Sequence, residues 1–125
     1  MAINSKEHLA EVFAKLLESL QANQATITRY TNWEVSVLFK LTDLNTSFSL
    51  RFAKGQVSGA IDDPVPCTIA IVVKAKVLDD IFSGRLDGES AYTMGMLSLQ
   101  GSEYTAESLL GYLPAIKTAY KQANP

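Results

Sequence analysis

Hydrophobic residues recur every three to four positions near the start of the chain. Over residues 4–20 they form one helical stripe, and charged residues occupy the other positions. The stripe consists of Leu9, Val12, Phe13, Leu16, Leu17 and Leu20. Asn4 followed three positions later by Glu7 resembles a capping box, and Ser5 is a competing cap. The segment is therefore predicted to be an amphipathic helix.

From residue 25 to residue 73 the hydrophobic period changes to two, which is typical of β-strands. The first strands are predicted at residues 26–28 and 33–41, the latter with five apolar side chains on one face. After a turn, residues 48–52 repeat this one-sided pattern, so the two segments should form a hairpin. A further strand is predicted at residues 56–61.

A proline-containing loop at residues 62–66 separates these strands from an apolar, β-branched segment at residues 67–73. Because this segment has almost no polar positions, it is predicted to be a strand with both faces covered, under a helix. Residues 76–82 then have the pattern of a short helix that Gly84 ends. Asp87 can cap a second short helix.

The last third of the chain is predicted to hold a brief strand at residues 96–99, closed by Gly101, and a final helix. The apolar stripe of that helix consists of Tyr104, Leu109, Leu110, Leu113, Ile116 and Tyr120. Pro114 should kink the helix or divide it in two. This order of elements predicts an α+β fold in which helices pack on one face of a mainly antiparallel sheet.

Size and charge narrow the range of functions. A chain of 125 residues fits one domain over residues 1–125. The formal charge is −2 and no basic cluster is present, so nucleic acid is not an expected partner. No apolar run approaches the ~20 residues of a membrane span, and the first residues lack the pattern of a signal peptide. The single cysteine fits a reducing compartment, so we expect a soluble, cytoplasmic protein.

The residues that usually carry chemistry are scattered. His8 and Cys67 have no partner at the spacing of metal ligands, which argues against a metal site. His8 is expected on the solvent side of its helix, and Cys67 in an apolar strand that disfavours a thiolate. The carboxylate pairs Asp62–Asp63 and Asp79–Asp80 are interpreted as solvated caps and turns. We therefore expect no enzyme and no cofactor.

Between Cys67 and Gly101 the chain reads CTIAIVVKAKVLDDIFSGRLDGESAYTMGMLSLQG. An apolar strand, a short helix, a glycine with a basic neighbour, an Asp turn, an alanine with an aromatic residue and an alternating strand follow one another. This segment resembles the sterol carrier protein type two family. The matching positions are residues 69–73, 78–82, Gly84, Arg85, Asp87, Ala91, Tyr92, Gly95, residues 96–99 and Gly101. The segment 75–77 departs from the family because it lacks a polar start to the short helix.

The resemblance implies a five-stranded sheet covered by helices, with an apolar tunnel between the sheet and the C-terminal helix. The tunnel would bind or transfer a lipid, such as a fatty acid, acyl-CoA, a sterol or isoprenoid, or a phospholipid, without catalytic residues. The predicted lining residues are Ile81, Phe82, Leu86, Met94, Met96, Leu109, Leu110, Leu113 and Ile116. The flexible methionines would adapt to different acyl chains. Contact with a membrane would be transient, without stable insertion.

A second hypothesis assigns the stripe of the final helix to another protein or to a second copy of the chain. In that case Leu109, Leu113, Ile116 and Tyr120 would form the surface of an interaction module or homodimer that could be accessory to an enzyme.

Overall fold

The structure, a computed structural model, describes residue 3 and residues 5–22, 35–53, 56–62, 66–101 and 103–124; over residues 103–112 it describes the backbone. The strand predicted at residues 26–28 lies outside these ranges, as do Asn4 and Asp63.

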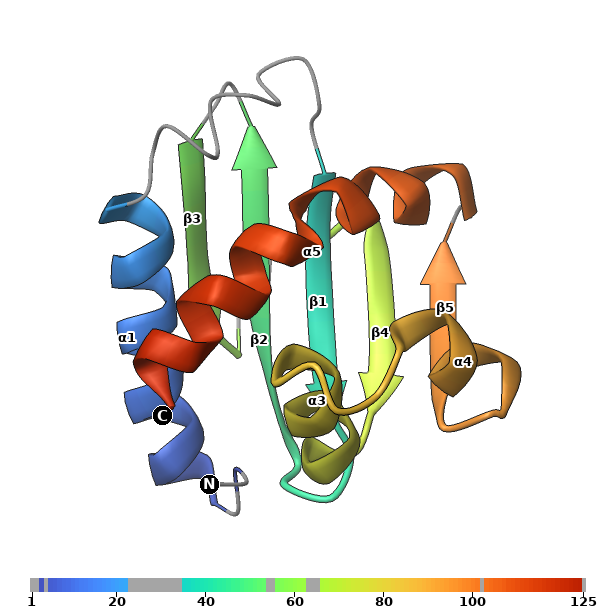
Figure 1. Cartoon of the computed structure of the whole chain (residues 1–125), viewed down its shortest axis with the longest axis horizontal. Helices are drawn as coiled ribbons and strands as arrows, with labels where there is room; N and C mark the ends of the chain where they lie inside the picture. Colours follow the sequence, from blue (N-terminus) through green and yellow to red (C-terminus); the bar gives the residue numbers. More distant parts are fainter. Residues whose placement is uncertain are drawn as a thin grey trace.

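In the described residues five strands form one sheet, in the order β3-β2-β1-β4-β5 (Figure 1). The strands are β1 (Val35–Leu41), β2 (Thr46–Ala53), β3 (Gln56–Ile61), β4 (Ile69–Val73) and β5 (Leu97–Gly101). All neighbouring pairs are antiparallel except β1 and β4, which run parallel because the chain crosses over between β3 and β4. The predicted α+β fold with a five-stranded, mainly antiparallel sheet is confirmed.

Four helices complete the described structure, and α1, α3 and α5 lie on the same face of the sheet (Figure 1). The helices are α1 (Lys6–Ala22), α3 (Ala75–Phe82), α4 (Gly88–Thr93) and α5 (Glu103–Ala123). We call the helix-covered face of the sheet the inner face and the opposite face the outer face. The alternation predicted for β1 and β2 is observed, since Phe39 and Phe48 pair across the two strands and stack on the inner face at 4.9 Å.

Helix α1 begins after Ser5, the competing cap in the sequence. The Ser5 hydroxyl accepts a hydrogen bond from the His8 amide at 3.0 Å, and the Ser5 carbonyl accepts one from Leu9 at 2.9 Å. Buried side chains of the helix, Leu9, Val12, Phe13, Leu16 and Leu20, are all members of the predicted stripe. The stripe therefore faces the core.

Helix α3 begins at Ala75 although its own first residues provide no polar cap. Asp43, in the turn between β1 and β2, accepts a hydrogen bond from the Ala75 amide at 3.0 Å. A carboxylate at this position accepts a hydrogen bond from a backbone N–H that has no partner within the helix. Its negative charge also interacts favourably with the positive end of the helix dipole. The polar group that segment 75–77 lacks is thus provided by a residue 32 positions earlier in the chain.

The second half of the chain departs from prediction in two places. Strand β4 begins at Ile69, so Cys67 precedes the strand and is partly exposed. The three middle side chains of β4 are also partly exposed. The prediction of a strand covered on both faces is therefore wrong, because the described helices α1, α3 and α5 lie on the inner face and leave the outer face of β4 without a covering helix. Helix α5 continues from Glu103 to Ala123 with Pro114 inside it, so the alternative of two separate helices is also wrong.

Candidate functional site

The inner face of the sheet is covered unevenly. Over β1 and β2 every inward side chain is buried, from Val35 to Leu41 and from Phe48 to Phe52. Over β4 and β5 the inward side chains of Ile71, Leu97 and Leu99 remain partly exposed, although they continue the same face by register. The apolar inner face is therefore incompletely covered on the side where α4 and the first half of α5 lie (Figure 1).

Helix α3 is fixed against the sheet and α5 by aromatic side chains. The Phe82 ring contacts Phe39 at 5.5 Å and Tyr120 at 5.4 Å, both in edge-to-face geometry. Phe82 is buried together with Leu78 and Ile81 on the same helix. This packing fixes the position of α3 relative to the C-terminal half of α5.

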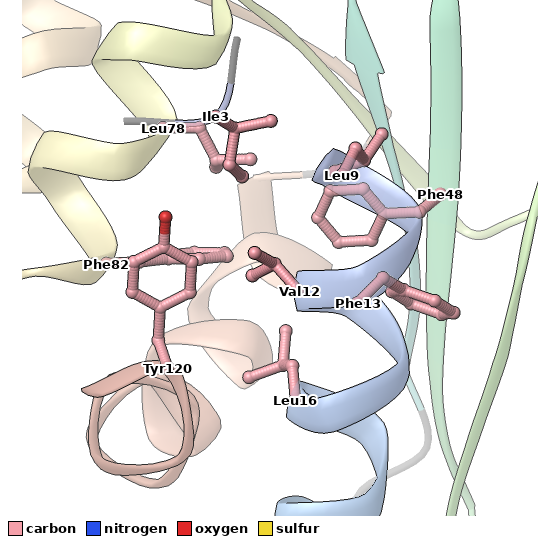
Figure 2. A pocket seen from close by; sticks show the side chains of 9 residues that line it. All are labelled: Ile3, Leu9, Val12, Phe13, Leu16, Phe48, Leu78, Phe82 and Tyr120. Carbon is pink, nitrogen blue, oxygen red and sulfur yellow. The ribbon is translucent and has the colours of Figure 1, made fainter. Parts of the chain in front are cut away.

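A small cavity lies between α1, α3, α5 and the Phe48 ring of β2 (Figure 2). Its lining consists of Ile3, Leu9, Val12, Phe13, Leu16, Phe48, Leu78, Phe82 and Tyr120. The volume that the centre of a water-sized sphere can occupy in this cavity is about 10 Å³. That is room for about one water molecule, whereas ligand pockets measure roughly 300–1,000 Å³. The cavity is a gap in core packing and cannot hold a lipid at this size.

Asp79 is a buried carboxylate at the junction of α3 and the end of α5. The residue is 1% exposed, and its side chain accepts hydrogen bonds from the Tyr120 hydroxyl at 2.5 Å and from Arg85 at 2.5 Å. Asn124 donates to both Asp79, at 3.4 Å, and the Tyr120 oxygen, at 3.0 Å. The interpretation of Asp79 as a solvated cap is wrong. Adjacent helical residues point about 100° apart, so Asp79 faces α5 while Asp80 faces outward.

The electrostatics of this cluster favour a structural role. Burial raises the pKa of the Tyr120 hydroxyl well above its usual range, and the hydrogen bond to Asp79 raises it further. Asp80 accepts from Lys76 at 2.8 Å and from Arg85 at 3.1 Å, and the Lys76 hydrogen bond in particular lowers the pKa of the Asp80 carboxyl. The hydrogen bonds of Asp79 and Asp80 join α3 to Arg85 and to the end of α5, so the cluster fixes these parts of the chain relative to one another.

The remaining candidates for chemistry do not assemble into a site. The described residues contain no group of three or more metal-ligating side chains. His8 is partly buried rather than on the solvent side, and its Nδ1 atom is shielded from solvent without a hydrogen-bond partner among the described residues. Asp62 is a turn residue, as predicted, and its carboxylate accepts from the Ser47 amide and the Thr46 hydroxyl at 2.9 Å each. None of the described helices is long and apolar enough to cross a membrane.

Comparison with known families agrees with this fold. The sequence model of the SCP-2 sterol transfer family matches residues 13–113, which is most of the chain. The chain belongs to the SCP-2 sterol transfer family. No curated protein sequence matches this family member closely enough to count as a relative.

Solved structures share the fold at low sequence identity. The crystal structure of sterol carrier protein 2 matches with a TM-score of 0.66 and 18% identity, covering 90% of this chain and 92% of that one. Sterol carrier protein 2 from Aedes aegypti, in complex with palmitate, matches with a TM-score of 0.59 and 17% identity, covering 85% and 91%.

The fold also occurs as part of an enzyme. The stereoselective inverting sec-alkylsulfatase from Pseudomonas sp. matches with a TM-score of 0.59 and 17% identity over 70% of this chain. This SCP-2 family member spans 14% of the length of that enzyme. At these identities the structural matches demonstrate the fold alone.

The predicted lining residues of this SCP-2 family member fall into four groups. Ile81, Phe82 and Ile116 are buried in the core, and Leu86 and Leu113 are partly buried against it. Met94 and Met96 are 62% and 40% exposed. Leu109 and Leu110 lie where the structure describes only the backbone. The buried group is therefore part of the core, and the partly buried pair packs against it.

Sequence reasoning missed the inward side chains of β4 and β5. Leu97 and Leu99 alternate with polar residues, which was a sufficient signal for a one-sided strand. Ile71 had no such signal, because every position of β4 is apolar. The alternative interaction surface on α5 also changes, since Ile116 and Tyr120 pack into the chain's own core and cannot contact a partner.

Proposed function

We propose that this SCP-2 family member binds a lipid through its long apolar portion and catalyses no reaction on it. The observation that carries the proposal is the uneven cover of the inner face. Ile71, Leu97 and Leu99 are partly exposed on a face that is elsewhere buried. The ligand would lie over β4 and β5, beside α5, with Leu86 and Leu113 at its borders.

Burial of apolar surface supplies the driving force. Each square ångström of apolar surface removed from water contributes roughly 25 cal/mol. A hydrocarbon chain over β4 and β5 would bury the remaining exposed surface of Ile71, Leu97 and Leu99. The chain itself would also be removed from water. Because the ligand binds the folded state alone, it would stabilise the protein by mass action.

This apolar surface indicates the class of ligand, but it does not identify the individual lipid. One methylene group changes affinity by only about 1–3 kcal/mol. An apolar surface therefore separates fatty acids, acyl-CoA, sterols, isoprenoids and phospholipids weakly. The proposal accordingly names a long apolar chain or ring system as the recognised part of the ligand.

Mass spectrometry of the purified protein under native and extracting conditions tests the proposal directly. We expect a co-purifying lipid, or a rise of several degrees in the melting temperature when palmitate is added in excess. Cholesterol, a polyprenol and a phospholipid form the comparison panel. A delipidated protein that shows neither bound lipid nor a thermal shift with any of the four would contradict the proposal.

A pair of variants on one strand locates the site. Ile71→Trp fills the space over β4 on the inner face, and we expect palmitate affinity to fall at least tenfold. Val72→Trp is the matched control, because Val72 is the next residue, is also partly exposed and points to the outer face. Equal affinities in the two variants, both folded by circular dichroism, would place the lipid elsewhere.

A further inference from the structure

We infer that β5 is the interface of a homodimer, in which two copies pair their β5 edges across a two-fold axis into one continuous sheet. The sheet has two edge strands, β3 and β5, and each presents backbone donors and acceptors that no neighbouring strand uses. Proteins usually protect such edges. The two edges of this sheet differ in protection.

The β3 edge is protected. Helix α1 lies along it (Figure 1), and the Gln21 side chain donates a hydrogen bond to the Val57 carbonyl of β3 at 3.2 Å. In the described part of the chain no strand lies beyond β5, and only α4 and the loop that joins it to β5 extend past the strand, beside its first half (Figure 1). A second strand can therefore approach β5 but not β3.

The sequence at β5 lacks the residues that discourage strand pairing. Between Glu89 and Glu103 thirteen residues in succession carry no charge, and none of them is proline. Charged side chains and proline are the common means of blocking an edge strand. Ser98 and Gln100 are exposed but neutral, so a strand laid beside β5 meets no charge.

Exposed hydrophobic side chains gather at the same edge. Among the residues whose side chains the structure describes, the exposed large hydrophobics are Tyr92 at 47%, Met94 at 62% and Met96 at 40%. All three fall within five residues, directly before β5. Methionine and tyrosine are enriched at the centre of protein interfaces, where charged residues are depleted.

Two further considerations identify the partner as a second copy. A two-fold axis places each residue of β5 opposite a residue of the same strand, and an uncharged strand is then self-complementary. Pairing of β5 with the β3 edge of another copy would build an open filament, and α1 prevents it. A membrane fits less well, because unpaired strand edges are not tolerated in hydrocarbon.

The interface consists of a five-residue strand and three neighbouring side chains, so association should be in the micromolar range. Sedimentation and light scattering of the intact chain between about 1 µM and 1 mM should show the mass rising from 13.6 kDa toward twice that value. A chain that stays monomeric throughout this range would overturn the inference.

Charge variants test the assignment to β5. In Ser98→Lys/Gln100→Lys, two-fold pairing sets like charges opposite one another, and we expect association at least tenfold weaker. Ser98→Glu/Gln100→Glu should behave the same alone, yet an equimolar mixture of the two variants should dimerise. This rescue cannot arise from misfolding. The matched control, Gln56→Lys/Ser58→Lys, changes two exposed positions of β3 and should leave the mass unchanged.

Two results would contradict the inference. One is a dimer that the β5 lysines do not weaken, or a mixture of opposite charges that does not associate. The other is a monomer that phosphatidylcholine vesicles retain and that Met94→Ser/Met96→Ser releases, since the patch would then contact a membrane.

Discussion

Tyr120→Phe removes a single oxygen atom from the buried polar cluster that Tyr120 forms with Asp79. The Tyr120 hydroxyl donates to the Asp79 carboxylate at 2.5 Å and accepts from Asn124 at 3.0 Å. The ring itself stays, and with it the packing against Phe82. The variant therefore removes the hydrogen bonds of the Tyr120 hydroxyl, which join α3 to the end of α5, and keeps the aromatic contact between the two helices.

The magnitude follows from the kind of bond that is lost. Hydrogen bonds to charged groups contribute roughly 1.5–3 kcal/mol. Asp79 keeps its bond from Arg85, so the carboxylate is not left without donors. We expect the free energy of unfolding to fall by about 2 kcal/mol. With an unfolding entropy of about 2.1 cal/mol/K per residue, this lowers the melting temperature by roughly 8 °C.

Urea titration followed by circular dichroism measures this change. The midpoint should decrease at unchanged slope, because the surface exposed on unfolding stays the same. The matched control is Tyr92→Phe, which removes a hydroxyl from a side chain that is 47% exposed. Its stability should stay within about 0.5 kcal/mol of the wild type.

The pH dependence gives an independent test. Tyr120 has a raised pKa in the folded state, so its contribution to stability is complete below the unfolded pKa of about 10 and declines as pH rises above that value. The difference between wild type and Tyr120→Phe should therefore be constant between pH 7 and 9 and shrink at higher pH. A loss below 0.5 kcal/mol at pH 7, or a difference that grows above pH 10, would refute this account.

Two further substitutions test the sheet. Gly59→Ala should cost about 3 kcal/mol, because an added Cβ would lie 2.1 Å from the Ser49 carbonyl oxygen, while the exposed neighbour Ser58→Ala should change the urea midpoint little. Asp62→Asn should cost less than about 1 kcal/mol, since the site is exposed. The Ser47 amide lowers the folded pKa of Asp62, so this difference should be present above about pH 4 and vanish as pH falls through the folded pKa. A Gly59→Ala protein as stable as Ser58→Ala, or an Asp62→Asn effect that persists at pH 2, would contradict these assignments.

The elements with a strong hydrophobic period were predictable from the sequence. The stripe of α1 and the alternation of β1 and β2 identified the residues that are buried, because one face of each element must leave water. The Asp87 cap of α4 was predictable too, since its carboxylate accepts from the Ser90 amide three residues later at 3.0 Å. These interactions are local in the chain.

The candidate site was less predictable. An apolar stripe predicts which side chains avoid water, but it does not predict which neighbouring element covers them. Ile116 and Met96 are both apolar, yet the first is buried in the core and the second is 40% exposed. Asp79 and Asp80 are identical in type and adjacent in sequence, and only the position of α5 separates a buried carboxylate from a partly exposed one.

The sequence by itself thus determined the order of the elements, the faces that α1, β1 and β2 bury, and the family to which the chain belongs. Those properties depend on periods of a few residues and on short motifs. The tertiary structure alone decided which apolar surface stays partly uncovered over β4 and β5, and which of the two sheet edges is free. Both depend on contacts between residues far apart in the chain, such as Gln21 with Val57 and Asp79 with Tyr120. Only the packing of the helices on the sheet brings such residues together.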